Sequence, residues 1–273
     1  MTVAGSSDGD WTWIDAIQMA MPVFARLGAV YTTNSAYFSK MYSLYKNTKT
    51  TQGLYDTTNH LWWRDATFKP PSTTQCYWSR GNGWVFAALT RILDVIPANE
   101  SHRSEYVSDF TAMASALKAI QRSDGFWNQS LTNPNQDGGP ELSGTALFAY
   151  GMAWGLRTGV LDSSYGPIVT KAWCAMASAV HSNGFLGYVQ GSGSAPAAGV
   201  TFDSVPDFQD FGLGVFCSAA AKSISWRRRK PLRLDWCPLL QIPCIGGTNT
   251  THHDGSSSDS DPDPESVSES VPC

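Results

Sequence analysis

A repeat of about 65 residues narrows the possible folds of this chain more than any other feature of its sequence. Four segments share one pattern, a turn-like entry followed by a helix dense in small and aromatic residues. Their marker positions, Asp15, Gly81, Gly144 and Gly212, are separated by 66, 63 and 68 residues. A fixed period is typical of stacked structural units, so we expect one fold built from similar pieces.

A second kind of helix is predicted between these segments, because apolar residues recur there at helical spacing. The three ranges are residues 35–48, 101–121 and 164–181. Each is followed by a glycine–aromatic turn, at Gly53, Gly125 and Gly184, and glycine commonly ends a helix. One period is therefore a small-residue helix for a buried inner ring and an amphipathic helix for an outer ring with one wet face.

Helix pairs at this period predict an all-α fold of the α/α toroid type. Such rings usually close with six hairpins, an (α/α)6 toroid, which at this period would need about 390 residues. Residues 10–226 hold about three and a half to four hairpins, so the toroid is expected to be incomplete. Because Asp15 already lies in a predicted helix, the missing hairpins are expected to precede it, as in an N-terminally truncated chain.

Composition divides the chain into three parts. Residues 1–9 are polar and expected to be flexible, and residues 10–226 form the partial α/α domain. Residues 227–273 begin with a basic cluster and continue as an acidic, Ser- and Pro-rich stretch of low complexity. We expect this tail to be disordered, because it has too few apolar residues to bury.

Charge and hydropathy exclude several functional classes. The net charge is -4, whereas nucleic-acid binders usually carry a basic excess. The sequence contains no run of 18 apolar residues, so no membrane span is predicted. The N-terminal stretch lacks the apolar core of a signal peptide. The localisation therefore stays open. The six Cys form no C-x-x-C pair, so a zinc or iron–sulfur site is not expected.

The chain is rich in tryptophan, with 11 Trp in 273 residues. Indole rings stack on the flat apolar faces of sugars, so this abundance favours a carbohydrate-binding cleft. A core rich in aromatic residues is the alternative for any single Trp.

Three ordered motifs resemble one known family. Residues 11–22 resemble its W-x-D-x-x-x-M-x-x-P inner helix, residues 77–84 match its W-S-R-G-N-G-W signature, and residues 138–148 match its E-x-S-G-T-A-x-F element. Over about residues 10–225 the chain therefore resembles glycoside hydrolase family 105, the unsaturated rhamnogalacturonyl hydrolases. The resemblance implies a six-hairpin fold and an oligosaccharide substrate without a cofactor; we expect a monomer.

The resemblance also implies an activity. Members of this family remove a 4,5-unsaturated uronic acid from the non-reducing end of pectin fragments. One aspartic acid protonates the double bond of the vinyl ether and then, as a carboxylate, activates the water that adds to the neighbouring carbon. The hemiketal collapses and the glycosidic bond opens, so the paired carboxylates of ordinary glycosidases are not needed.

Carried onto this sequence, the catalytic acid and base is Asp15. Its apolar neighbours Trp13, Ile14, Ile17 and Met19 are expected to raise its pKa by removing water from the carboxylate. From the residues alone, a carboxylate that caps the helix is the alternative.

The resemblance places Arg80 and Trp84 in the substrate subsite, where they lie one helical turn apart. The guanidinium of Arg80 suits a uronate carboxylate, and the indole of Trp84 suits a sugar ring. In the alternative interpretation, Arg80 caps a loop and Trp84 belongs to the core. Further substrate contacts are expected from Trp13, His60, Arg64 and Asp65. An ordinary loop ion pair is the other interpretation of Arg64 and Asp65.

Two functions from different classes stay open. The first is the hydrolase, and the second is a catalytically inactive truncated α/α toroid, a sugar-binding remnant or a defective gene model. In the second case Trp13, Ile17, Met19 and Met21 are expected to be exposed along an open edge. Three further acidic residues at inner-helix entries, Glu141, Asp207 and Asp210, are expected to have helix-terminus roles.

Overall fold

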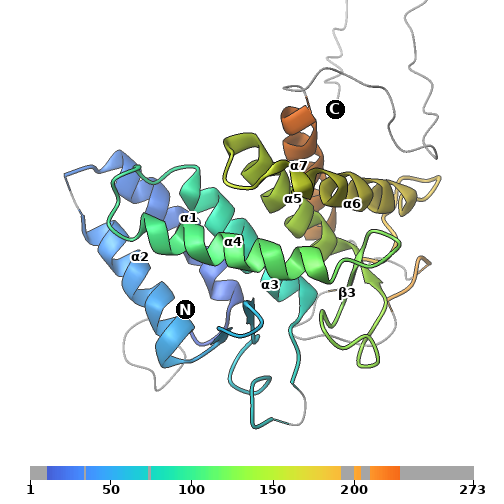
Figure 1. Ribbon diagram of the computed structural model, residues 1–273, viewed down its shortest axis with the longest axis horizontal. Coiled ribbons are helices and arrows are strands. Elements are labelled where there is room, and N and C mark those ends of the chain that lie inside the picture. Colours follow the sequence, from blue (N-terminus) through green and yellow to red (C-terminus); the bar gives the residue numbers. More distant parts are fainter. Residues whose placement is uncertain (1–10, 34, 73–74, 192–199, 204–209, 228–273) are drawn as a thin grey trace, which may run out of the picture. The chain divides into compact units, whose positions relative to one another are not determined.

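The structure, a computed structural model, describes most of the predicted helical region (Figure 1). The described residues are 11–33, 35–72, 75–191, 200–203 and 210–227. The chain divides into two units, Met1–Leu239 and Leu240–Cys273, and all described residues belong to the first. The N-terminus predicted over 1–9 and the tail predicted over 227–273, apart from its first residue, lie outside the described residues. The proposed division at 226 stays a prediction.

Helices of two kinds alternate along the chain. The first kind comprises α1 (Asp15–Val30), α3 (Ser79–Leu93), α5 (Leu142–Thr158) and α7 (Asp210–Arg227). The second comprises α2 (Ala36–Lys46) with a π-helical turn η1 (Asn47–Thr51), α4 (Arg103–Ala119), and α6 (Gly166–Ser178) preceded by the 3-10 turn η2 (Ser163–Tyr165). The described residues thus form three and a half hairpins, and the all-α prediction is confirmed.

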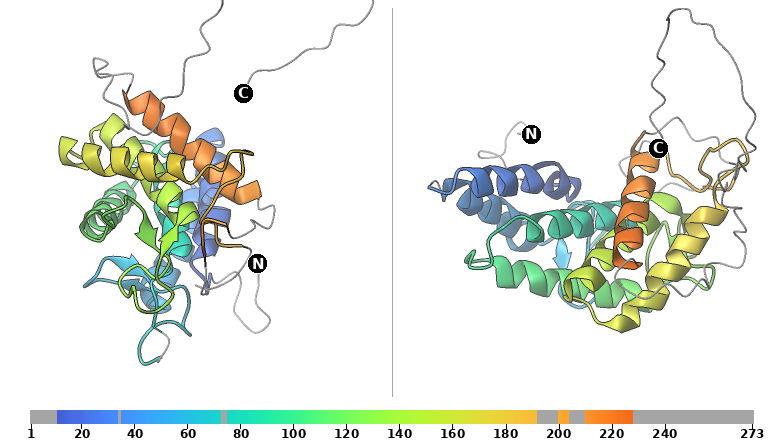
Figure 2. Two further views of the ribbon diagram at one scale, coloured as in Figure 1. Left: turned by 90° about the vertical axis from the view of Figure 1, so that its right-hand side faces the viewer. Right: turned by 90° about the horizontal axis from the view of Figure 1, so that it is seen from above.

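The two kinds of helix form the predicted inner and outer rows. Each of α1, α3 and α5 packs against the next inner helix, and α2, α4 and α6 pack on α1, α3 and α5. Figures 1 and 2 show α4 lying along one side of α3. Every residue from 142 to 155 of α5 is buried, whereas α4 buries one stripe that includes Tyr106, Phe110 and Met113. Within the described ranges, none of the helices has the length and apolar character needed to cross a membrane.

Two short hairpins of strands, which the sequence did not predict, lie in the loops. Strand β1 (Tyr55–Asp56) pairs antiparallel with β2 (Leu61–Trp62), and β3 (Trp127–Asn128) pairs antiparallel with β4 (Pro140–Glu141). A strand of two residues is too short to show an alternating pattern, so periodicity could not reveal it. The predicted turn glycines 53, 125 and 184 do adopt positive φ, but they lie two to six residues beyond the helices.

The exposure of the side chains at residues 13–21 differs in part from the prediction. Met19 is 59% exposed and Trp13 is 37% exposed, as expected. Ile17 and Met21, in contrast, are fully buried, so their predicted exposure is wrong. These two side chains lie four residues apart on the stripe of α1 that faces the core, whereas Met19 lies between them on the other side.

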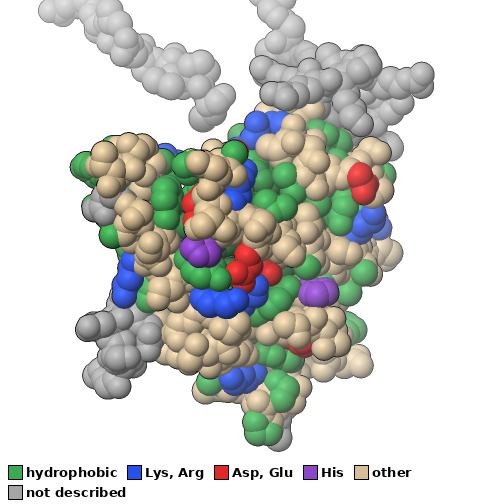
Figure 3. Space-filling model, turned by 60° about the vertical axis from the view of Figure 1, so that its left-hand side comes forward, with side chains coloured by type: hydrophobic (Ala, Val, Ile, Leu, Met, Phe, Trp, Pro, Cys, Tyr) green, Lys and Arg blue, Asp and Glu red, His purple; other side chains and the backbone are tan. Residues whose placement is uncertain are grey.

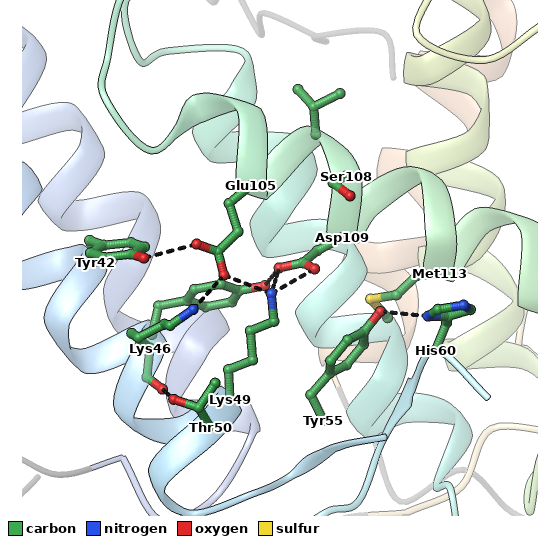
Figure 4. A network of polar contacts seen from close by, with 12 residues as sticks. Tyr42, Lys46, Lys49, Thr50, Tyr55, His60, Glu105, Ser108, Asp109 and Met113 are labelled. Carbon is green, nitrogen blue, oxygen red and sulfur yellow. Dashed lines mark hydrogen bonds and ion pairs between the residues drawn. The ribbon is translucent and has the colours of Figure 1, made fainter. Parts of the chain in front are cut away.

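A charged network joins the first two hairpins across their outer helices. Figure 3 shows acidic and basic side chains gathered at the middle of one face, and Figure 4 shows the network from close by. Lys49 Nζ lies 2.6 Å from Asp109 Oδ2 and 2.8 Å from Glu105 Oε1. The Tyr45 hydroxyl donates to Asp109 Oδ2 at 2.7 Å. The network therefore ties η1 and α2 to α4.

Gly151 permits the close approach of α5 to α3. A Cβ atom at this position would lie 2.4 Å from Phe86 Cε1, and the Phe86 ring is held by stacking on Phe110 with centroids 4.5 Å apart. We expect Gly151→Ala to lower the free energy of unfolding by about 1–3 kcal/mol, because overpacking forces the core to shift. Denaturant titration measures the change.

The control for this prediction is Gly214→Ala in α7. A Cβ atom there would have nothing within 4 Å, and alanine is favoured over glycine in a helix. No loss of stability is expected, and an equal loss in both variants would show that steric overlap is not the cause.

Candidate active site

The starts of α1, α3 and α5 are each held by the loop that follows the outer helix of the same hairpin. The backbone bonds run from Ile14 N to Arg64 O, from Ser79 N to Gln129 O and from Leu142 N to Tyr188 O, at 3.1, 2.9 and 2.9 Å. The first turns of α1 and α3 lie close together. A Cβ atom built on Gly81 of α3 would lie 3.5 Å from Oδ1 of Asp15 in α1. The first turns of the inner helices and their loops therefore form one site.

Asp15 lies at the first turn of α1 and is only 8% exposed. Its Oδ1 is buried without a hydrogen-bond partner among the residues that the structure describes. Burial raises the pKa of Asp15 to about 6, against the opposing effects of the Arg80 and Arg64 charges and the Trp13 side chain. A carboxyl group with this pKa is able both to donate a proton and to accept one near neutral pH.

Trp13, Arg64 and Asp65 lie together beside Asp15. Residues 13 and 65 form an isolated antiparallel bridge, and Arg64 Cζ lies 4.8 Å from the centroid of the Trp13 ring. Arg64 also forms an ion pair with Asp65. These side chains line an open hollow of 290 Å³. The structure thus brings these three predicted residues together at the site.

Arg80 lies in the first turn of α3 and is buried. Its guanidinium donates to the carbonyl oxygens of Gln190 at 2.7 Å and Gly191 at 3.1 Å, and it lies 4.7 Å from the Trp78 ring centroid. Burial lowers the pKa of Arg80, and the carboxylates of Glu141 and Asp15 oppose this shift. Arg80 therefore places a positive charge near Asp15 while it also holds the 190–191 loop.

The other two predicted substrate residues lie differently. Trp84, one turn after Arg80 on α3, is half-buried and packs against the core. His60 is exposed in the turn between β1 and β2, with Nδ1 at 3.0 Å from the Tyr55 hydroxyl. Figure 4 shows His60 on the side where α4 presents Met113, near the charged network. The substrate roles of Trp84 and His60 stay predictions.

Of the three acidic residues at inner-helix entries, Glu141 has the predicted helix-terminus role. Its carboxylate accepts from the backbone N–H groups of Ser143 at 3.0 Å and Gly144 at 2.6 Å, which caps α5. Asp207 lies outside the described residues. Asp210 begins α7, and its side chain is outside the described part.

Two residues near the site were missed from the sequence. Gln18 lies three residues after Asp15 on the same side of α1, and its Oε1 is buried with no hydrogen-bond partner in the described ranges. This spacing was a signal that could have found it. Gln190 accepts from Trp78 Nε1 at 2.8 Å and lies 110 residues after Arg80, so no local pattern pointed to it.

Comparison with known proteins identifies relatives of this chain. It is 36% identical over 222 residues to the unsaturated 3S-rhamnoglycuronyl hydrolase of Formosa agariphila, a match that covers 78% of this chain and 57% of the relative. The chain spans about half the length of the curated relatives it matches.

Solved structures share its fold. A glycosyl hydrolase family 88 structure from Bacteroides vulgatus matches with 36% identity and a TM-score of 0.73, over 81% of this chain and 65% of that one. The motifs resemble family 105, and a possible member of that family from Salmonella enterica also matches. Its identity is 20% and its TM-score 0.66, over 84% of this chain and 60% of that one. At this identity the second match shows the fold alone.

A family model agrees with these matches. The model described as Glycosyl Hydrolase Family 88 matches residues 6–225. This range contains the three motifs and every inner-helix start of the described structure. Because the match covers most of the chain, the chain belongs to Glycosyl Hydrolase Family 88.

Proposed function

We propose that this chain is a hydrolase that removes a 4,5-unsaturated uronic acid from the non-reducing end of rhamnogalacturonan-type oligosaccharides. The observation that supports it most is Asp15, a buried carboxyl group with a raised pKa whose Oδ1 has no hydrogen-bond partner among the described residues. Trp13 and Arg64, which both affect this pKa, line an open hollow. The family membership and the name of the Formosa relative agree with this chemistry.

The proposed reaction uses Asp15 twice. In its acid form Asp15 donates its proton to C4 of the unsaturated ring, and positive charge develops at C5 next to the ring oxygen. The resulting carboxylate takes a proton from water as the water oxygen bonds to C5, which gives a hemiketal and restores the acid. The C5–ring oxygen bond then breaks to give a ketone, and C1 becomes a hemiacetal that expels the leaving sugar.

The charges around Asp15 suit this substrate. Arg80 lies close enough to affect the pKa of Asp15, and its positive charge attracts the uronate carboxylate. Trp84, one turn further along α3, supplies the ring against which we propose the uronic acid packs. The buried setting strengthens both interactions by excluding water.

The pKa of Asp15 predicts the pH dependence of the reaction. The first step needs the protonated carboxyl group, and the pKa is raised to about 6. We therefore expect kcat/KM to be level below about pH 6 and to fall about tenfold for each further pH unit. Initial rates between about pH 4.5 and about pH 8 measure this profile, and a rise in kcat/KM above pH 6 would contradict the acid role.

The test of the function itself is an absorbance assay on a lyase-digested rhamnogalacturonan. A hydrolase removes the ultraviolet absorbance of the unsaturated uronyl group, because the double bond is hydrated. An unchanged absorbance would instead support the inactive toroid, and a rising absorbance on the undigested polysaccharide would indicate a lyase. Mass spectrometry of the products shows whether an unsaturated uronic acid has been removed.

A further inference from the structure

Gln18 is a buried polar residue on the inner helix α1. Its side chain is 8% exposed, and its Oε1 is buried without a hydrogen-bond donor among the described residues. A buried acceptor without a donor lowers the stability of a fold, and almost all such groups in proteins have a partner. Packing alone therefore does not explain why this position carries an amide.

Asp15 has an acceptor of the same kind one turn earlier in α1. It is also 8% exposed, and its Oδ1 is buried with no partner in the described ranges. Side chains three residues apart lie on one side of a helix, and a long side chain leans back toward the preceding turn. The Gln18 amide therefore extends toward the turn that contains Asp15.

The two buried oxygen atoms need the same kind of partner. When Asp15 is a carboxylate, Oδ1 and the Gln18 Oε1 are both acceptors, and neither can donate to the other. A molecule with two hydrogens satisfies both, and buried waters typically bind to polar groups that have no other partner. With both hydrogens engaged, the lone pairs of the water oxygen stay available for attack.

We propose that Gln18 Oε1 and Asp15 Oδ1 together hold the water molecule that hydrates the substrate. As the water oxygen bonds to C5, one proton passes to Asp15, and the other stays on the new hydroxyl, which Gln18 orients. Gln18 is thus a positioning residue, which acts through the water. This inference rests on the proposed function, because the water is consumed only if Asp15 acts on an unsaturated uronyl group.

Gln18→Met removes the acceptor and keeps the length of the side chain. Because Oε1 has no partner among the described residues, its loss should not lower the free energy of unfolding, which denaturant titration measures. We expect kcat on a lyase-digested rhamnogalacturonan oligosaccharide to fall about 10- to 100-fold with KM unchanged. A reacting group displaced by about 1 Å can cost about 100-fold in rate.

Methanol as a competing nucleophile separates positioning of the water from a general effect on rate. Methanol has one hydroxyl hydrogen, so it can donate to Asp15 or to Gln18 but not to both. Its adduct at C5 has no hydroxyl, so the ring stays closed and mass spectrometry detects the substrate plus one methanol. The methanol share of the products should be about threefold to tenfold higher in Gln18→Met than in the wild type, as expected for one hydrogen bond between neutral groups.

Gln121→Met is the matched control. The Gln121 amide donates to the backbone oxygens of Gly125 at 3.0 Å and Ile168 at 3.1 Å, so it joins the loop after α4 to α6. This variant should lose stability, because two hydrogen bonds are removed, but it should keep the methanol share of the wild type.

The outcomes separate this inference from the proposed function. If the wild type consumes the substrate and Gln18→Met gives the same methanol share, the role of Gln18 is overturned and the hydrolase proposal stands. An equal increase in Gln121→Met would also overturn that role, because lost stability would then explain the share. If the wild type adds neither water nor methanol to the substrate, the hydrolase proposal fails and this inference fails with it.

Discussion

Asp15→Asn is expected to abolish turnover of unsaturated uronyl substrates. Loss of one positioned proton-transfer group costs roughly 10²–10⁴-fold in rate, and Asp15 is proposed to act as acid and then as base, so the loss should be at the upper end or beyond. The decrease in absorbance on a lyase-digested oligosaccharide measures it. Turnover close to that of the wild type would remove Asp15 from the mechanism.

The stability of the same variant separates a chemical effect from a folding effect. The pKa of Asp15 is higher in the folded chain than in the unfolded one, so the stability that this group contributes falls as the pH rises from 3.8 to about 6, and the full cost is present at higher pH. An uncharged amide avoids this cost, which is at most about 3 kcal/mol for a shift of this size. We therefore expect Asp15→Asn to unfold at pH 7 at an equal or higher denaturant concentration than the wild type.

Lys49→Met is expected to lower the free energy of unfolding by about 3–5 kcal/mol, because it leaves a buried charge without its partner. Side chains of Lys49 and Asp109 are only 11% and 7% exposed, and the Tyr45 hydroxyl alone would then remain on Asp109. Burial by itself would raise the pKa of Glu105, but hydrogen bonds from Lys49, Tyr42 and Lys46 lower it to about 2. Glu105 is therefore ionised throughout the physiological range, and denaturant titration at pH 7 measures the contribution of Lys49 to stability.

A matched lysine provides the control for this second variant. Lys222 pairs with Asp94 at 3.0 Å, but Asp94 also accepts from Trp154 Nε1 and Arg157, so it keeps two donors when the lysine is removed. Lys222→Met should cost no more than about 1 kcal/mol, the value typical of exposed pairs. Equal losses in the two lysine variants would show that burial of the pair is not what matters.

The helices could be predicted because their signals are local. The ranges 35–48, 101–121 and 164–181 each contain an observed outer helix, since apolar residues at helical spacing need only the sequence to be seen. The raised pKa of Asp15 was also expected from its apolar neighbours, and the structure gives the same direction.

Contacts between distant parts of the chain could not be predicted. Arg80 binds the backbone of Gln190, which is 110 residues away, and the carbonyls that it meets have no sequence signature. The exposure of Ile17 was misjudged for a related reason, because the side of α1 that the neighbouring helices cover depends on packing. The types of the side chains were enough to choose candidate site residues such as Arg80, but they did not reveal the contacts of these residues.

The backbone hydrogen bonds at the starts of α1, α3 and α5 bear on how a site of this kind can change in evolution. Ile14 and Arg64 are 50 residues apart, and this single stretch contains α1 with Asp15, its outer partner α2 and the start of the loop that lines the hollow. The same arrangement recurs from Ser79 to Gln129. Each of these two hairpins thus supplies both a pair of packed helices and a loop at the candidate site. Exchange of one such hairpin would change one loop of the candidate site and leave the packing between the other inner helices in place.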